Sequence, residues 1–118
     1  WLPNFAHLTL FWRAEQASLD DLEIALRLRD AQRVVVAQVG GRPADGYYPT
    51  SDWLAGELVR DQHSFWLAED FRPGRYAVEV SVADVQSGTP LLPRGTGVDG
   101  QGWVFLTQIE VRSHEPSD

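Results

Sequence analysis

The sequence contains no cysteine, no methionine and no lysine. Without cysteine, the chain has no disulfide, no thiolate metal site and no cysteine nucleophile. Without methionine it has no start residue, so we expect a piece of a longer or processed protein. Apolar runs stop at four residues, as at 34–37, whereas a membrane helix needs about 20. We therefore expect that the domain itself does not insert into a membrane.

Positive charge is also scarce. Ten arginines stand against 17 acidic residues, which gives a formal net charge of −7. Because affinity for phosphate backbones comes from clustered lysine and arginine, no nucleic-acid partner is expected. The chain has neither a Gly-x-Ser-x-Gly elbow nor a glycine-rich phosphate loop. We therefore predict no catalytic residue and no cofactor.

The dominant pattern has a period of two. Side chains of a strand point to opposite faces in turn, so alternation of apolar and polar residues predicts a strand with one buried face. Four stretches alternate in this way: 8–13, 22–29, 76–83 and 105–112. A fifth stretch, 34–39, is apolar on both faces, which predicts a strand that is covered on both sides.

The stretch 58–67 also predicts a strand, in one of two orientations. Either Val59, Phe65 and Leu67 point inward, or Leu58 and Trp66 do, and we favour the first set. Turn residues separate the stretches, and a hairpin is predicted at 30–33. Residues 87–102 hold five glycines and two prolines, which predicts a long loop of the kind that often carries function.

Short strands with frequent turns are typical of an antiparallel sandwich. With 118 residues in one domain, we predict an all-β, immunoglobulin-like antiparallel β-sandwich of about seven strands over residues 1–112, followed by a polar tail at 113–118. The expected core is Leu8, Leu10, Trp12, Leu22, Ile24, Leu26, Leu28, Val34, Val36, Val59, Tyr76, Val78, Val80, Val82, Phe105, Ile109 and Val111.

Four short motifs follow one another along the chain, and their order and spacing carry a resemblance to a known family. They are Leu-Thr-Leu-Phe-Trp at 8–12, Tyr-Pro-Thr-Ser-Asp-Trp at 48–53, Gly-Glu-Leu-Val-Arg-Asp at 56–61 and Pro-Gly-Arg-Tyr at 73–76. In order and spacing the chain resembles the C-terminal soluble β-sandwich domain of bacterial multi-pass membrane glycosyltransferases, the dolichyl-phosphate-mannose mannosyltransferase-like proteins. The likeness covers most of residues 6–112. Such domains have a further strand before the first motif, where this chain has only residues 1–6.

The resemblance implies an accessory module, since the transferase chemistry of that family sits in its membrane part. It also implies an extracytoplasmic location, on the outer face of the cell membrane. On this hypothesis the domain is non-catalytic and binds glycan or docks on the membrane part of its parent protein. An alternative is an immunoglobulin-like protein-interaction module, adhesive or inhibitor-like, that uses an edge strand or the 87–102 loop. A hydrolase is the third hypothesis.

Residues 47–53 form the densest cluster of aromatic and polar side chains. A sugar site needs flat rings against the pyranose and polar groups that pair with its hydroxyls. Tyr47, Tyr48 and Trp53 supply rings, and Asp52, together with Asp45, supplies acceptors. The alternative is that Trp53 closes one end of the sandwich and the tyrosines pack against it.

Two further tryptophans are candidates for an interaction surface. Trp66 lies on the face opposite Phe65 in the favoured orientation, and Trp103 borders the long loop. Exposed large aromatic side chains mark interaction surfaces more often than scattered leucines do. The alternative for both residues is ordinary packing.

The sequence predicts no metal site. The histidines at 7, 63 and 114 lack ligand spacing, and the Asp-Gly pairs at 45–46 and 99–100 lack a calcium-loop pattern. His63, Ser64 and Asp61 have the residue types of a hydrolytic triad. On a strand, however, His63 and Ser64 point to opposite faces and cannot act as base and nucleophile.

Overall fold

The computed structural model describes residues 4–17, 20–46, 48–67, 71–94, 98 and 101–112. Within them the chain forms six strands and two short 3-10 helices. The strands are β1 (Asn4–Arg13), β2 (Leu22–Arg29), β3 (Val35–Gly41), β4 (Leu58–Leu67), β5 (Gly74–Asp84) and β6 (Val104–Val111). The helices η1 (Pro43–Gly46) and η2 (Thr50–Asp52) lie between β3 and β4. Neither of these helices has the length and apolar character that a membrane crossing requires.

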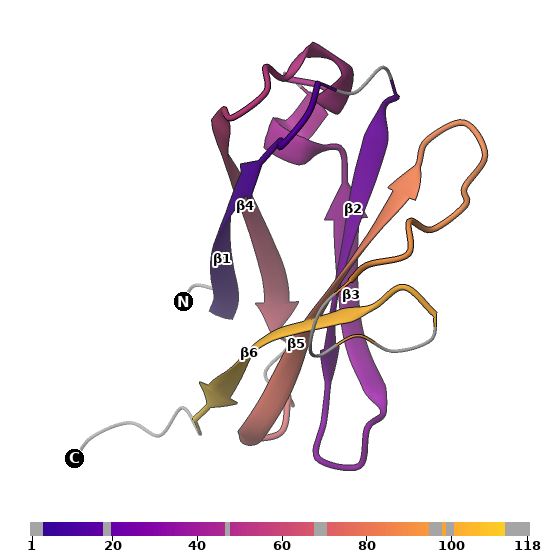
Figure 1. Ribbon diagram of the computed structural model, residues 1–118. Helices are drawn as coiled ribbons and strands as arrows, with labels where there is room; N and C mark the ends of the chain where they lie inside the picture. The colour runs from indigo at the N-terminus through magenta and orange to yellow at the C-terminus, as the bar shows by residue number, and fades with distance from the viewer. Residues whose placement is uncertain are drawn as a thin grey trace.

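The strands form two antiparallel sheets that face each other (Figure 1). One sheet pairs β1 with β4, and the other has the order β3-β2-β5-β6. The all-β antiparallel sandwich is therefore confirmed. Each of the six stretches predicted as strands is present, so the described residues hold six strands where about seven were predicted. The predicted hairpin at 30–33 is present too, because the Asp30 carboxylate accepts hydrogen bonds from the backbone N–H groups of Gln32 and Val34, each 2.9 Å long.

The core lies between the two sheets, on alternate residues of the central strands. Leu26 and Leu28 of β2 and Val78 of β5 are fully buried, and they face Phe65 of β4, which is 0% exposed. Val59 is buried on the same face of β4 as Phe65. The favoured orientation of 58–67 is thus confirmed.

The core prediction is wrong at Val34 and Val36. Val34 is 54% exposed and Val36 is exposed as well. The register places Ala37 opposite Leu28 and Val39 opposite Leu26, so these two residues of β3 face the core instead. The expectation that this stretch is covered on both sides fails because the described sandwich has two layers, so that the outer face of β3 meets solvent.

The core prediction is also wrong at Phe105, which is 45% exposed. A bulge between Val78 and Glu79 breaks the alternation, so that Phe105 lies opposite Glu79 on the outer face. Val104 takes the inward place opposite Val80. An extra residue in one strand of a pair turns the following side chains to the other face, and the local sequence pattern carries no sign of it.

A tyrosine near the start of β5 fixes the bend that leads into this strand. The Tyr76 hydroxyl donates a 2.5 Å hydrogen bond to the carbonyl of Arg72. A tyrosine at this place in strand F is a hallmark of immunoglobulin-type sandwiches. On that scheme the order β3-β2-β5-β6 corresponds to C′-C-F-G, and the pair β1-β4 corresponds to B-E.

This correspondence identifies an unpaired edge. In an immunoglobulin domain strand A lies beside strand B, whereas here no strand within the described ranges pairs with the second edge of β1. An edge strand presents a row of free backbone N–H and C=O groups. The open edge of β1 is therefore the place where the described sandwich is incomplete.

Core burial and the bulge are tested together by two truncations. Because Phe65 is fully buried, Phe65→Ala should lower the free energy of unfolding by about 3–5 kcal/mol. Phe105→Ala should lower it by less than about 1 kcal/mol, since this ring faces outward. Urea denaturation followed by circular dichroism measures both values. Equal losses would contradict the position of the bulge.

Candidate functional site

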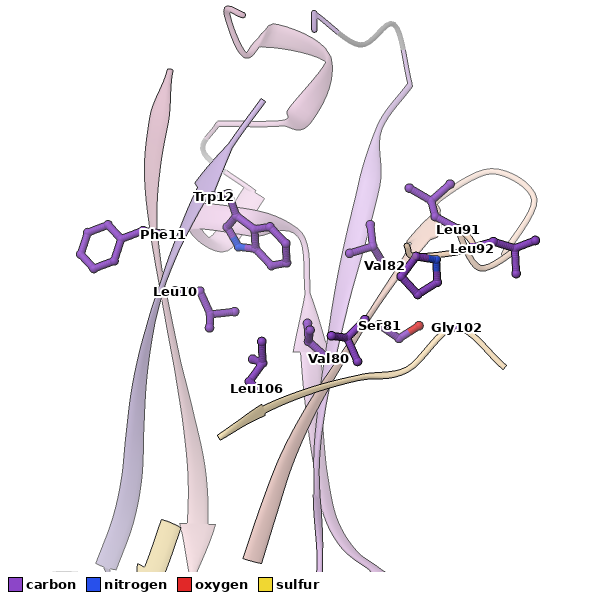
Figure 2. Close-up of a pocket in the computed structure, with 12 residues that line it drawn as sticks. Leu10, Phe11, Trp12, Val80, Ser81, Val82, Leu91, Leu92, Gly102 and Leu106 are labelled. Carbon is purple, nitrogen blue, oxygen red and sulfur yellow. The ribbon is translucent and has the colours of Figure 1, made fainter. Parts of the chain in front are cut away.

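An apolar cleft opens beside β1. It begins as a cavity of about 440 Å³ between β1 on one side and β5, β6 and residues 91–93 on the other. Leu10 and Trp12 point into it, while Phe11 points away (Figure 2). Its lining is Leu10, Phe11, Trp12, Val80, Ser81, Val82, Leu91, Leu92, Pro93, Gly102, Val104 and Leu106. This surface can bind an apolar group, and none of its described lining residues is an acid or a base.

A second cavity, of about 260 Å³, adjoins the first at the end of the sandwich. Trp12, Val82 and Leu91 line both cavities, so the two form one cleft. Trp53 and Thr50 bound the second cavity on the far side. The cleft therefore runs from the open edge of β1 to the end of the sandwich where η2 lies.

The segment after β5 forms the outer wall of the cleft. It folds back along β5, since the Leu91 N–H donates a 2.8 Å hydrogen bond to the carbonyl of Val82. Gly102 lets the chain enter β6 close to this wall, because its φ is +95° and a Cβ there would lie 3.2 Å from the Cβ of Pro90. Part of the predicted 87–102 loop is thus a fixed wall, with Leu92 81% exposed at the rim.

The predicted sugar-binding segment packs against the end of the sandwich. Trp53 is 6% exposed, and its indole N–H donates a 2.8 Å hydrogen bond to the carbonyl of Tyr48. The buried hydroxyl of Thr50 accepts from the N–H of Leu22 and donates to the carbonyl of Asp20. These bonds tie the segment to the start of β2.

The residues of this predicted site differ in how far they are exposed to solvent. The carboxylate-bearing Asp52 is exposed, Tyr48 is half-buried, and Tyr47 lies outside the described residues, as does the side chain of Asp45. Trp53 lines the second cavity. Glycan binding at 47–53 stays a prediction, and the second cavity gives a ligand one route to Trp53.

Tyr48 of this segment and Glu57 form a pair with shifted pKa values. The Tyr48 hydroxyl donates a 2.6 Å hydrogen bond to Glu57 Oε1, which also accepts a 3.0 Å bond from the N–H of Leu54. The bond from Tyr48, with the bond from Leu54 second, lowers the pKa of Glu57 below its ordinary value. The same bond to a carboxylate raises the pKa of Tyr48.

The two predicted interaction tryptophans differ in exposure. Trp66 is 62% exposed on the outer face of β4, in the place where the favoured orientation puts it. Trp103 is half-buried, and the guanidinium of Arg27 lies 4.0 Å from the centroid of its ring. Arg27 is held in turn by Glu79 at 2.6 Å. Trp66 therefore offers a free ring, whereas Trp103 is engaged within the fold.

Sequence reasoning missed a polar cluster between the sheets. Asp61, 1% exposed, accepts a 3.0 Å hydrogen bond from the indole N–H of Trp12 on its Oδ2 atom. His63 Nε2 lies 2.7 Å from the same oxygen. A signal was present in the sequence, since the strand that buries Val59 and Phe65 must also turn residues 61 and 63 inward.

His63 and Ser64, which have residue types of a hydrolytic triad, point to opposite faces of β4 as predicted. The histidine that contacts Ser64 is His7. Ser64 points outward, and its hydroxyl lies 2.7 Å from Nδ1 of His7 on β1. Among the described residues no carboxylate bonds to His7, so the pair lacks the third group that orients a catalytic base. Across all the described residues, no three His, Asp or Glu side chains lie close enough together to hold a metal ion.

Comparison with protein-family models, with curated proteins and with solved structures finds no match for this chain. The fold class therefore rests on the structure itself. The resemblance to the glycosyltransferase domains stays a prediction, and so do the roles that it implies.

The polar cluster should be important for stability. Asp61→Ala removes the acceptor of Trp12 and His63 in a buried place, so the free energy of unfolding should fall by about 3 kcal/mol. Asp52→Ala, at an exposed carboxylate, should change it by less than about 0.5 kcal/mol. Urea denaturation measures both. A loss at Asp61 as small as that at Asp52 would show that the cluster does not stabilise the fold.

The Tyr48–Glu57 pair should be visible in a carboxyl titration. Because the pKa of Glu57 is lowered, the stability that the bond supplies is present at neutral pH and is lost as pH falls through that pKa. Tyr48→Phe should move the Glu57 pKa up toward its ordinary value, as followed by carbon NMR of the carboxyl group. Tyr76→Phe, whose hydroxyl bonds a carbonyl elsewhere, should leave it unchanged. No change in Tyr48→Phe would refute the bond.

Proposed function

We propose that this domain is a non-catalytic docking module that accepts an extended strand of another polypeptide segment beside β1. The observation that supports this proposal is the apolar cleft along the unpaired edge of that strand. In β-strand addition, backbone hydrogen bonds give affinity and pockets for alternate side chains give specificity. On this proposal the open edge of β1 supplies the backbone hydrogen bonds, and the cleft supplies the pocket for alternate side chains.

The chemistry of the cleft defines the incoming strand. Leu10, Trp12 and Val82 line the interior, and the leucines at 91 and 92 lie at the rim. A strand with apolar side chains at every second position would place them in the cleft and leave its polar side chains in solvent. Burial of such side chains contributes about 25 cal/mol per Å² of apolar surface.

The family resemblance supplies the proposed partner. On this proposal the module docks on the membrane part of a larger glycosyltransferase-like protein, or on a segment that adjoins it, at the outer face of the cell membrane. The ordered motifs at 8–12, 48–53, 56–61 and 73–76 support this assignment. A complete gene that encodes no membrane-spanning segment ahead of this domain would contradict it.

The docking proposal is tested by supplying a strand. A segment of alternating valine and threonine is joined ahead of residue 1 through a flexible glycine–serine linker. If it fills the cleft, the thermal midpoint should rise by several degrees, at about 4 °C or more per kcal/mol gained. The control carries proline in place of each valine, which prevents pairing with an edge. Equal midpoints for both fusions would overturn the proposal.

Two leucine variants locate the effect. Leu92→Ser removes an exposed side chain at the rim of the cleft, so it should reduce the gain from the joined strand. Leu54→Ser removes another exposed leucine, one that does not line the cleft, so it should keep the gain. The same reduction in both variants would show that the strand binds elsewhere.

A further inference from the structure

The outer face of the β1–β4 sheet is a second surface, separate from the cleft. Strict alternation exposes ten side chains there, five from each strand, at the odd positions 5–13 and the even positions 58–66. The register sets them in five cross-strand pairs, from Phe5 opposite Trp66 to Arg13 opposite Leu58. Six residues of strand separate Phe5 from Phe11, or about 20 Å. We call this surface the outer strip.

The charge of the outer strip opposes that of the chain. The strip carries Arg13 and Arg60, and none of its ten side chains is acidic, although the chain has a net charge of −7. Within the described residues no ion pair forms with either arginine, whereas Arg27 and Arg29 on the other sheet both pair with Glu79. The strip is therefore complementary to an anionic partner that brings its own carboxylates.

Aromatic rings flank this strip at both ends. At one end Phe5 and Trp66 are cross-strand partners, and His7 stacks on Phe5 with ring centroids 5.9 Å apart. At the other end Phe11 lies opposite Arg60 and is exposed. Exposed rings of this kind offer flat faces to the apolar side of a pyranose, as well as to other apolar groups.

The middle of the outer strip decides between a saccharide and a lipid surface. Between the aromatic ends lie Thr9 opposite Gln62 and His7 opposite Ser64. His7 and Ser64 already pair with each other, but a membrane interior would desolvate Thr9 and Gln62 without pairing them, at a cost for each group. A saccharide chain would pair them with its hydroxyls while its rings contact the aromatic side chains.

We propose that the outer strip binds a linear polysaccharide whose sugar units carry carboxylates. Trp66 and Phe5 stack against sugar rings, the polar middle pairs with hydroxyl groups, and Arg13 with Arg60 binds carboxylates. This site differs from the predicted one at 47–53. It also does not depend on the docking proposal, because Trp66, Phe5 and Arg60 do not line the cleft, although Phe11 and Arg13 of the strip do.

The proposal is tested by NMR titration of the 118-residue chain with a hexasaccharide of β-1,4-linked mannuronate. Saturable amide shifts should centre on β1 and β4, and added sodium chloride should weaken the binding. Uncharged cellohexaose, which has the same linkage and length, should bind at least about tenfold more weakly. Equal affinities for the two sugars, or shifts centred on other elements, would overturn the proposal.

Variants assign the two kinds of contact. The double variant Arg13→Gln, Arg60→Gln should lower the affinity for the mannuronate by about tenfold or more and leave that for cellohexaose unchanged. Trp66→Ala should weaken both. Arg75→Gln and Phe105→Ala, at exposed positions of the other sheet, are the matched controls and should change neither.

A membrane is the competing partner for an aromatic surface with arginines. Vesicles of phosphatidylglycerol, with phosphatidylcholine vesicles as the uncharged reference, test it by sedimentation. The proposal expects no Trp66-dependent sedimentation. Trp66-dependent binding to the anionic vesicles, without binding to the mannuronate, would overturn it and assign the strip to a lipid surface.

Discussion

The structure depends on the packing of a two-stranded sheet against a four-stranded one. Two strands alone are at best marginally stable in water, so β1 and β4 owe their order to the side chains that they bury. Phe65 reaches the leucines of β2 and the valines of β5, and it is fully buried there. The pair Asp61 and Trp12 adds a hydrogen bond between β4 and β1 at the same layer. Apolar burial holds the layers together, and this bond links the two strands of the smaller layer.

A two-stranded layer has consequences for function. It leaves one edge of β1 without a partner in the described residues, and it leaves the side of the sandwich open between β1 and β6. The cleft follows from that opening, and the segment after β5 gives it a wall. The two faces of β1 thereby differ: Leu10 and Trp12 line the cleft, while Phe5 and His7 belong to the outer strip.

In the candidate sites, residues of the same type have different environments, which the residue type alone does not predict. Trp53 and Trp66 are the same residue type, yet Trp53 closes the end of the sandwich and Trp66 is exposed. His63 and His7 differ in the same way, since one meets a buried carboxylate and the other an exposed hydroxyl. Alternation along 58–67 was enough to place Trp66 and to imply that residue 61 is buried. It was not enough to bring Trp12 to Asp61, because that contact joins residues 49 positions apart.

The sequence by itself determined the strands and most of their inward faces, because the period of two is a local property that each strand carries in its own residues. It also determined the turn chemistry at 30–33. Tertiary structure decided the rest. Because the described sandwich has two layers, the outer face of β3 is uncovered, and Val34 and Val36 are exposed. The bulge opposite Val78 and Glu79 turned Phe105 outward. The cleft, the unpaired edge of β1 and the charge of the outer strip arise only when strands far apart in the chain are set side by side, and no local pattern encodes that pairing.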